Sequence, residues 1–203
     1  MSETLDLTEV LSRLVRAERI LILSHKNPDG DTLGSAAALY HALKKLGKSE
    51  VAVSCADLIP QRYQYMQIEL FCGQFEPQYI VAVDVASIQL FGDSVREYAE
   101  RVDLCIDHHA SNSGYADALY LDGDACATAE IIYNLICKMG VEIDPVLADC
   151  LYTGISTDTG CFLFGNTSVR SHEIAAKLMQ AGARVRDLNM ILFETKSLSL
   201  IHI

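Results

Sequence analysis

The sequence predicts an α/β fold, with a parallel sheet of about five strands and helices on both faces. Short apolar runs without polar alternation recur along the chain, and segments with helical spacing separate them. Such runs are typical of strands buried on both faces, and intervening helices are what parallel connections require. The expected strands are Arg19–Ser24, Glu50–Ser54, Tyr79–Val83 and Val102–Ile106, with a short extended piece at Ala118–Leu121.

The segments between and after these strands have the spacing and the end signals of helices. Thr8–Glu18 alternates leucine and valine with charged residues at helical spacing, and Thr8 or Asp6 is its expected cap. Gly47 and Gly140 each end a helix, because glycine readily adopts the left-handed conformation found just past helix ends. The expected helices are Thr8–Glu18, Gly30–Lys45, Gln61–Leu70, Ser94–Glu100, Ala125–Met139, Pro145–Ser156, Ser168–Ala181 and Val185–Thr195.

Composition limits the classes of protein to which the chain can belong. Half of its 203 residues are hydrophobic and 21% are charged, which is enough for a buried core. It has no uncharged apolar stretch of about 20 residues and no basic-then-apolar start, so we expect a cytoplasmic protein without a membrane segment. The formal net charge is −11, which argues against a long nucleic-acid duplex as partner. Seven cysteines without a C-x-x-C pair read as reduced thiols.

Acids and histidines follow three of the expected strands directly. His25, Asp29 and Asp31 come after the first strand, Asp84 after the third, and the triplet Asp107, His108 and His109 after the fourth. In open α/β sheets, ligands gather at the carboxyl ends of parallel strands. If these strands are neighbours, the side chains meet at one edge of the sheet.

A fourth segment, Gly154–Gly160, places Asp158 after an apolar helix and between glycines. Carboxylate oxygens suit hard divalent cations, and imidazole suits manganese, iron or zinc. About four carboxylates and two imidazoles are enough for two metals about 3.5–4 Å apart, which can activate water and clamp a phosphoryl oxygen. The residues therefore predict a two-metal phosphoesterase.

Simpler interpretations remain open for each segment taken alone. Asp29-Gly-Asp31 is also a common turn, and Asp84 is as well explained as the cap of a following helix. The amides opening the helix at Asp31–Ser35 suit an anion, but ordinary capping explains them equally well. Asn112 and the loop Asn166–Ser168 are polar candidates for substrate contact. Capping accounts for each segment separately but not for their shared placement.

At these residues the chain resembles the DHH phosphoesterase superfamily, named for the triplet seen here as Asp107-His108-His109. The matching motifs are His25–Ser35, Val83-Asp84, Asp107–Asn112 and Tyr152–Gly160, in order along nearly the whole chain. The last of them, with Phe162–Asn166 after it, is most similar to the bacterial nanoRNase and pAp-phosphatase branch. Ala110 departs from the proline that this branch often has at that position.

The resemblance implies a role for each site residue and a cofactor. His25, Asp29 and Asp84 would hold one metal, and Asp31, Asp84, His108 and Asp158 the second, with Asp84 bridging. His109 would face the scissile phosphate, and Asp107 would orient the histidines. The implied cofactor is a pair of divalent ions, Mn²⁺ first, with Mg²⁺ or Co²⁺ as alternatives.

The resemblance also implies a domain division. Residues 1–185 would form the catalytic domain and 186–203 the start of a connecting helix, without the smaller substrate-gripping domain that members usually carry. We therefore expect a preserved metal site with weak substrate capture, and a homodimer stays open.

The expected activity is hydrolysis of short oligoribonucleotides, of 3′-phosphoadenosine 5′-phosphate, or of both. Alternatives within the same chemistry are a cyclic-dinucleotide phosphodiesterase, an inorganic pyrophosphatase and an exopolyphosphatase. From a different class, a nucleotide-binding regulatory module without catalysis also fits a chain of this kind, as does a structural domain whose acids are helix caps.

Overall fold

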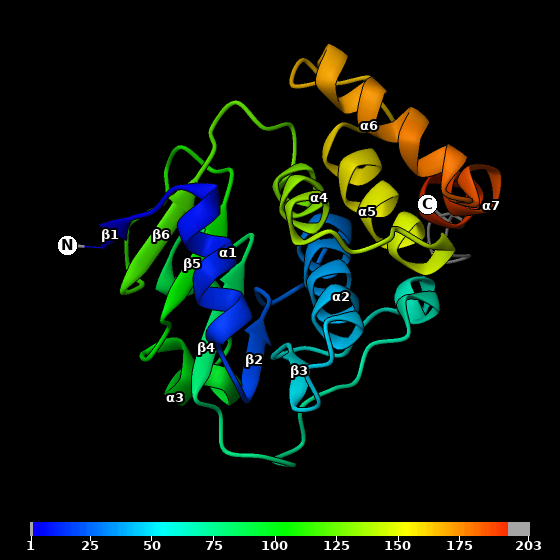
Figure 1. The fold of residues 1–203 in the computed structure, drawn as a ribbon. Coiled ribbons are helices and arrows are strands. Elements are labelled where there is room, and N and C mark those ends of the chain that lie inside the picture. The colour runs from blue at the N-terminus through cyan, green and yellow to red at the C-terminus, as the bar shows by residue number, and fades with distance from the viewer. Residues whose placement is uncertain (1, 195–203) are drawn as a thin grey trace, which may run out of the picture.

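The computed structural model describes residues 2–194 and contains one parallel sheet of six strands, in the order β1-β6-β5-β4-β2-β3 (Figure 1). The expected α/β fold is confirmed, with one more strand than predicted, because Glu3 and Thr4 pair with β6. The strands are β1 (Glu3–Thr4), β2 (Ile20–Leu23), β3 (Val51–Ser54), β4 (Tyr79–Val83), β5 (Leu104–Asp107) and β6 (Ala118–Leu121). Strand β4 pairs with β2 on one side and β5 on the other, so the strands that precede the acidic segments are neighbours.

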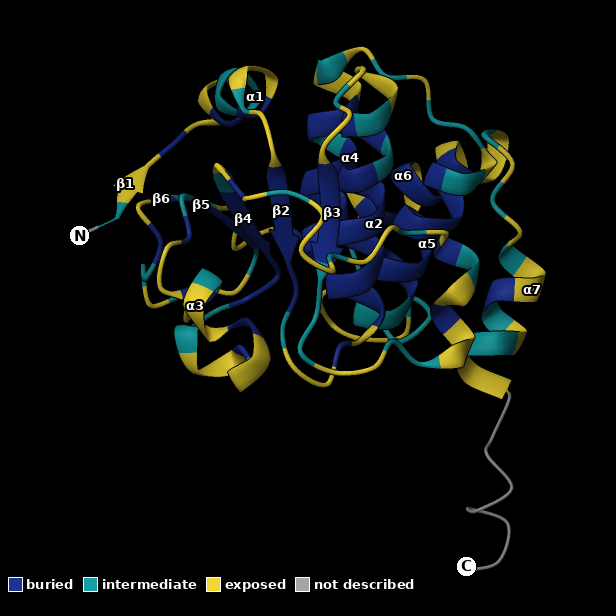
Figure 2. Cartoon of the chain, turned by 90° about the horizontal axis from the view of Figure 1, so that it is seen from below, coloured by how far each residue is buried: buried dark blue, intermediate teal, exposed yellow. Residues whose placement is uncertain are grey.

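One face of the sheet carries two layers of helices. Helices α1 (Leu7–Arg16), α2 (Gly30–Lys45) and α4 (Thr128–Met139) cover this face, and α5 (Pro145–Asp158) and α6 (Val169–Gln180) stack outside them (Figures 1 and 2). Because α2 lies between the sheet and α5, it is buried almost all round (Figure 2). The main core forms here, between alternate strand residues such as Ile20 and Val81 and the apolar side chains of the helices.

The other face has a thinner cover. The short helix α3 (Arg96–Ala99) and the 3₁₀ turns η2 (Ile88–Leu90) and η3 (Asp93–Val95) lie on it. The strand residues that point this way, among them Leu21 and Ala82, form a second and smaller core with Phe91 and Val95. Burial of the strands on both faces explains why their sequences lack alternation.

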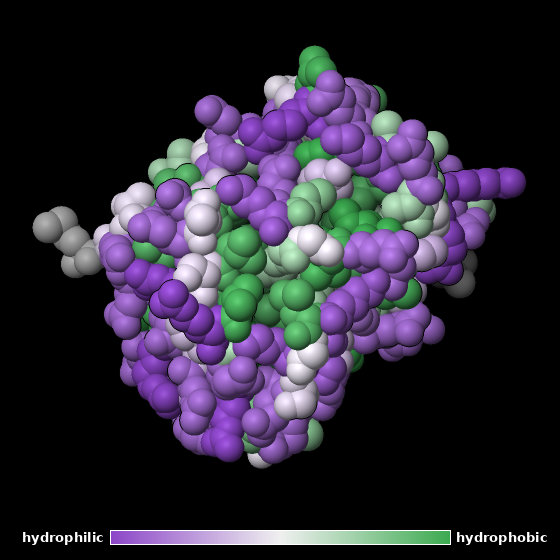
Figure 3. All heavy atoms as spheres, viewed as in Figure 1, coloured by the Kyte–Doolittle hydropathy of each residue, from purple (hydrophilic) through white to green (hydrophobic). Residues whose placement is uncertain are grey.

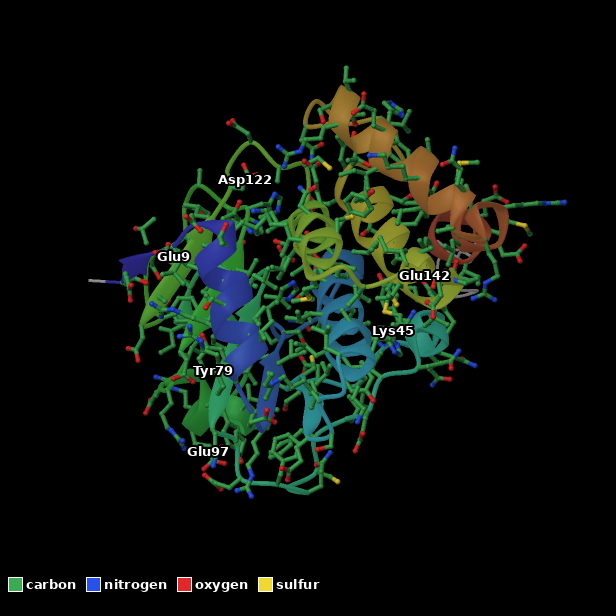
Figure 4. All side chains as sticks on the ribbon, in the orientation of Figure 1. Glu9, Lys45, Tyr79, Glu97, Asp122 and Glu142 are labelled. Atoms are coloured by element: carbon green, nitrogen blue, oxygen red, sulfur yellow. The ribbon has the colours of Figure 1, made fainter. Side chains whose placement is uncertain are left out.

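Helices α2 and α5 approach so closely that glycine is needed at the crossing. A Cβ on Gly34 would lie 2.5 Å from the carbonyl oxygen of Cys150 in α5. At its other end, α2 is tied to the α4–α5 connection, because Lys45 Nζ donates to the carbonyl oxygen of Glu142 and pairs with Asp144 (Figure 4). These contacts fix α5, and with it Asp158, relative to the sheet.

Several expected boundaries are wrong. Residues Gln61–Met66 form a 3₁₀ helix, η1, instead of a helix to Leu70, because Leu70 pairs with Val53 at the sheet edge. Helix α4 begins at Thr128, three residues after the predicted start. The expected final helix is α7 (Val185–Asn189) followed by a π turn, η4 (Met190–Glu194). The rest of the expected connecting helix lies outside the described residues.

The surface is mostly polar, with a hydrophobic strip on the face shown in Figure 3, over the region between α1 and the pair α2 and α4. Within residues 2–194, no helix combines the length and apolar character needed to cross a membrane. The seven cysteines, all in the described part of the chain, form no disulfide there, and Cys72 and Cys137 are exposed.

Candidate metal centre

The carboxyl ends of β2, β4 and β5 deliver the predicted site residues to one edge of the sheet. His25 follows β2, Asp84 follows β4, and β5 ends at Asp107, directly before His108 and His109. Because β4 lies between the other two strands, these segments meet above its end. The structure thus brings together what the sequence placed at separate strand ends.

The backbone conformation of Asp84 directs its side chain toward the site. Its φ is +61°, in the left-handed region that non-glycine residues rarely adopt. The Asp84 amide still donates to the carbonyl oxygen of Ile106, and Thr32 Oγ1 donates to the carbonyl oxygen of Val83. No helix follows directly, so the alternative that Asp84 caps a helix is wrong. Strain of this kind is characteristic of functional positions.

The start of α2 supplies two carboxylates. Asp29 caps the helix, since its Oδ1 accepts from the amides of Asp31 and Thr32 at 3.0 and 3.1 Å. Those amides are therefore used, and capping, not anion binding, explains the helix opening. The other carboxylate oxygen of Asp29 lies 3.6 Å from His25 Nε2.

The last residue of α5, Asp158, completes the cluster from the second helical layer. Helix α5 passes close to Asp31, because a Cβ on Gly154 would lie 2.7 Å from Asp31 Oδ1. The sequence motif around Asp158 therefore serves two purposes. Its glycine allows the approach, and its acid enters the site.

Three overlapping groups of side chains have ligand atoms within 4.8 Å of one another: His25, Asp29 and Asp84; Asp31, His108 and Asp158; and Asp84, His108 and His109. His108 Nε2 lies 3.7 Å from Asp84 Oδ1, 3.7 Å from Asp158 Oδ2 and 4.0 Å from Asp31 Oδ2. These separations exceed hydrogen bonds, and among the described residues this buried nitrogen has no hydrogen-bond partner. An unpaired imidazole nitrogen facing three carboxylates fits a divalent cation.

Hydrogen bonds set the orientation of the two candidate imidazole ligands. His25 Nδ1 donates to the carbonyl oxygen of Lys26 at 2.8 Å, and His108 Nδ1 donates to that of Ala125 at 3.2 Å. A proton on Nδ1 leaves Nε2 with its lone pair directed at the carboxylates. This is the arrangement that protein partners commonly impose on metal-binding histidines.

His109 differs from its neighbour in exposure and partner. Its Nδ1 donates to Asp107 Oδ1 at 2.8 Å, and its side chain is 43% exposed, against 12% for His108. Asp107 is fully buried and also accepts from the amides of His108 and His109. The pair therefore holds one imidazole at the mouth of the site with Nε2 free to face a substrate.

Asn112 lies behind Asp107. Its Nδ2 donates to Asp107 Oδ2 at 2.7 Å, and its Oδ1 accepts from the amide of Gly114 at 2.9 Å. This side chain thus positions Asp107, a role that the sequence did not indicate. Its predicted contact with substrate stays a prediction.

The N-terminus of α4 contributes a residue that sequence reasoning missed. The amides of Thr128 and Ala129 donate to the two oxygens of Asp31 at 2.7 and 2.9 Å, and Thr128 Oγ1 donates to Asp84 Oδ1 at 2.9 Å. The helix start thus fixes two carboxylates at once. Placing that start at Ala125 hid this role of Thr128.

Crowding of acids dominates the electrostatics of the site. Burial, and then the charge of Asp158, raises the pKa of Asp31 to about 6. Burial, and then the charges of Asp31 and Asp29, raises the pKa of Asp84 well above its usual value. Opposing its burial, hydrogen bonds from His109 and Asn112 lower the pKa of Asp107, and the bond to Asp107 raises that of His109. Excess negative charge of this kind is what bound cations neutralise.

The cavity at the cluster measures about 160 Å³ and is lined by His25, Asp29, Asp84, Leu90, His109 and Asp158. A larger cavity of about 440 Å³ lies between η1 and η4, beside Gln61, Arg62, Tyr65 and Ile191. None of the described residues that line it is an acid or a histidine, so the smaller cavity is the candidate site. Two residues of the loop Asn166–Ser168, a candidate for substrate contact, make hydrogen bonds within the protein. Asn166 Nδ2 donates to the carbonyl oxygens of Cys126 and Asp158, and Ser168 caps α6.

Residues 19–155 match the DHH family, N-terminal domain, and the chain belongs to this family, as the motifs predicted. It is 34% identical over 176 residues to the bifunctional oligoribonuclease and PAP phosphatase NrnA of Thermus thermophilus, covering 83% of this chain and 52% of that protein. It is 30% identical over 168 residues to a probable manganese-dependent inorganic pyrophosphatase of an Exiguobacterium species, covering 77% of this chain and 52% of that protein.

Among solved structures, an exopolyphosphatase-related protein from Bacteroides fragilis superimposes with a TM-score of 0.85 at 26% identity. The match covers 97% of this chain and 62% of that one. The chain therefore spans between about half and three fifths of the length of the proteins that it matches.

Proposed function

We propose that this chain forms the catalytic unit of a metal-dependent phosphoesterase that hydrolyses short oligoribonucleotides and 3′-phosphoadenosine 5′-phosphate. The observation that carries the proposal is that Asp31, Asp84 and Asp158 face the buried His108 Nε2, which has no hydrogen-bond partner among the described residues, while His25 and Asp29 meet the same Asp84 from the other side. The identity with an NrnA protein over most of the chain supports this choice of substrate class.

The ligand set fits two divalent cations, with Mn²⁺ as the first candidate. His25, Asp29 and Asp84 would hold one, and Asp31, Asp84, His108 and Asp158 the other, with Asp84 shared. When bound, such a pair lowers the pKa of water and neutralises charge on phosphoryl oxygens.

The other site residues act on the substrate and on each other. Water adds to phosphorus as the bond from phosphorus to the leaving oxygen breaks, and a proton must reach that oxygen. We assign this proton transfer to His109, and its support is that Asp107 holds Nδ1 of a half-exposed imidazole that lines the cavity. Asn112 and Thr128 keep Asp107 and Asp84 in position.

The test is incubation of the chain, in excess over substrate, with a two- to five-nucleotide RNA and Mn²⁺. Release of mononucleotides that depends on Mn²⁺ and is lost in Asp84→Asn supports the proposal. With enzyme in excess, a single turnover is enough for product to be detected. If no product forms under these conditions, the proposal is wrong.

A second candidate is an inorganic pyrophosphatase, favoured by the 30% identity to the Exiguobacterium protein. The same cluster serves either reaction, because both cleave a phosphorus–oxygen bond with water. Phosphate release from pyrophosphate, compared with mononucleotide release from RNA, separates the two. Binding of metal and nucleotide without either product would indicate the regulatory module.

A further inference from the structure

The turn that follows Asp158, a residue of the candidate metal centre, exposes two large apolar side chains. Leu163 is 84% exposed and Phe164 is 59% exposed, whereas most apolar residues of this chain are buried. Adjacent exposed apolar residues at the rim of a polar site often mark a place where a ligand is held.

The turn has an unusual backbone that other contacts hold in place. Gly160, Cys161 and Phe162 all have positive φ, at 57°, 57° and 64°. For residues other than glycine this conformation costs about 1–2 kcal/mol each. The residues of the turn do not prefer this conformation, so contacts with the surrounding structure must hold it.

Three contacts provide this support. The amides of Leu163 and Phe164 both donate to the carbonyl oxygen of Thr159 at 2.9 Å. Asn166 Nδ2 bridges the carbonyl oxygens of Asp158 and Cys126. The Phe162 ring stacks on His172 with centroids 5.0 Å apart and planes at 22°. The position of Phe164 is thus set before any ligand arrives.

The ring of Phe164 lies against Gly160. A Cβ on Gly160 would overlap the ring atoms of Phe164, so the ring rests directly on the glycine. One side of the ring is covered in this way, and its high exposure shows that the opposite side is open. An aromatic ring held on one side and open on the other is suited to stacking.

The size of the cavity decides what must lie outside it. At about 160 Å³ it is close in size to the cavity of about 150 Å³ that holds one benzene ring, so a phosphate group with its cations takes up most of it. A nucleobase does not fit in the remaining space. A nucleotide with its phosphate in the cavity must therefore place its base on the rim, and Phe164 is the exposed aromatic residue on the turn that follows Asp158, whereas Phe162 is partly buried.

We propose that Phe164 is the stacking platform for the base of a nucleotide whose phosphate lies at the metal centre. This proposal rests on the proposed function, since it needs a nucleotide substrate. Stacking on an aromatic ring accepts every base, because each base has a π face. The chain would then recognise short RNA without sequence preference at this position.

The chain contains no tryptophan, so a single substitution can report on the platform. We expect Phe164→Trp to keep a stacking surface and to show saturable fluorescence quenching by adenosine 5′-monophosphate in the presence of Mg²⁺. Ribose 5-phosphate has the same phosphate without the base, and we expect it to displace the nucleotide without quenching by itself.

Met179→Trp is the matched control. Met179 is 56% exposed near the end of α6, ten residues after Val169 and therefore about 15 Å along the helix from its start. It should not respond to the nucleotide. Equal quenching at both positions, or a flat response of Phe164→Trp at millimolar nucleotide, overturns the proposal.

Kinetics separate this inference from the proposed function. Phe164→Ala should raise KM for a dinucleotide by about 5- to 150-fold with a smaller change in kcat, and Phe164→Tyr should restore KM. A dinucleotide lacking the base at the stacking position should show no such difference between variants. If the unmodified chain cleaves RNA but Phe164→Ala leaves KM unchanged, only the platform is refuted.

Discussion

Asp84 lies between the two candidate metal positions. It is buried, has a positive φ, and appears in two of the three candidate ligand groups. We predict that Asp84→Asn lowers the hydrolysis rate by at least about 10²–10³-fold, because it removes a preorganised charge at the reacting centre.

The same substitution should stabilise the metal-free protein, since it removes one of several crowded carboxylates. Thermal unfolding in EDTA measures this effect, and the Thr128 bond can be kept because the amide of asparagine retains an acceptor oxygen. A wild-type rate in this variant would show that Asp84 is not at the chemistry.

The neighbours His108 and His109 allow metal binding and chemistry to be separated. His109 is bonded to Asp107 and exposed, whereas His108 Nε2 is buried among the carboxylates. We predict that His109→Ala keeps metal affinity and loses about 10²–10⁴-fold in rate, the range typical of proton-handling groups.

His108→Ala is the matched comparison and should lose both metal affinity and rate. Calorimetric titration with Mn²⁺, together with single-turnover rates on a short RNA, distinguishes the two variants. Equal metal affinities in both would contradict the assignment.

At the scale of elements, the crossing of α2 and α5 sets the position of Asp158. We predict that Gly34→Ala lowers the free energy of unfolding by about 1–3 kcal/mol, because the added methyl group meets the backbone of α5 at Cys150. Alanine has a helix propensity about 1 kcal/mol more favourable than that of glycine. This gain does not offset the clash, because the backbone of α5 cannot move away.

Gly165→Ala is the control for this substitution. Its added Cβ meets no atom within 4 Å, and its φ is not positive, so urea unfolding should change little. Metal affinity should fall in Gly34→Ala, because separating the helices moves Asp158 from His108. An unchanged unfolding midpoint in Gly34→Ala would show that the helices can part without cost.

Across the whole molecule, the stability of the metal-free protein should fall as pH rises from 5 to 7.5. Burial and neighbouring acids raise the pKa of Asp31 to about 6 and that of Asp84 well above its usual value, so the folded state holds protons that the unfolded chain has released. The raised pKa values of His25 and His109 act in the same direction. The folded state binds these protons more tightly than the unfolded chain, and the stability that they provide is lost as the imidazoles deprotonate over this range.

Metal should reverse the trend, since binding requires deprotonated ligands and therefore strengthens with pH. Urea midpoints measured at both pH values, in EDTA and in Mn²⁺, test both statements. Stability in EDTA that rises between pH 5 and 7.5 would show that the buried acids are not crowded in the folded state.

The sequence by itself determined which elements carry the site and most of its side chains. Apolar runs without alternation identified the parallel strands. The acids and histidines directly after these runs identified the site, because both patterns lie within short stretches of sequence. Asp158 was found in the same way, from a motif at the end of a helix.

Only the tertiary structure decided that β4 lies between β2 and β5, that α5 crosses α2 at Gly34, and that Thr128 and Asn112 hold Asp84 and Asp107. Strand order, helix approach and hydrogen bonds between distant segments depend on packing across the whole core. No single stretch of sequence contains that information, which is why the candidate ligands could be predicted from local patterns, whereas the role of Thr128 and the bond from Asn112 to Asp107 could not.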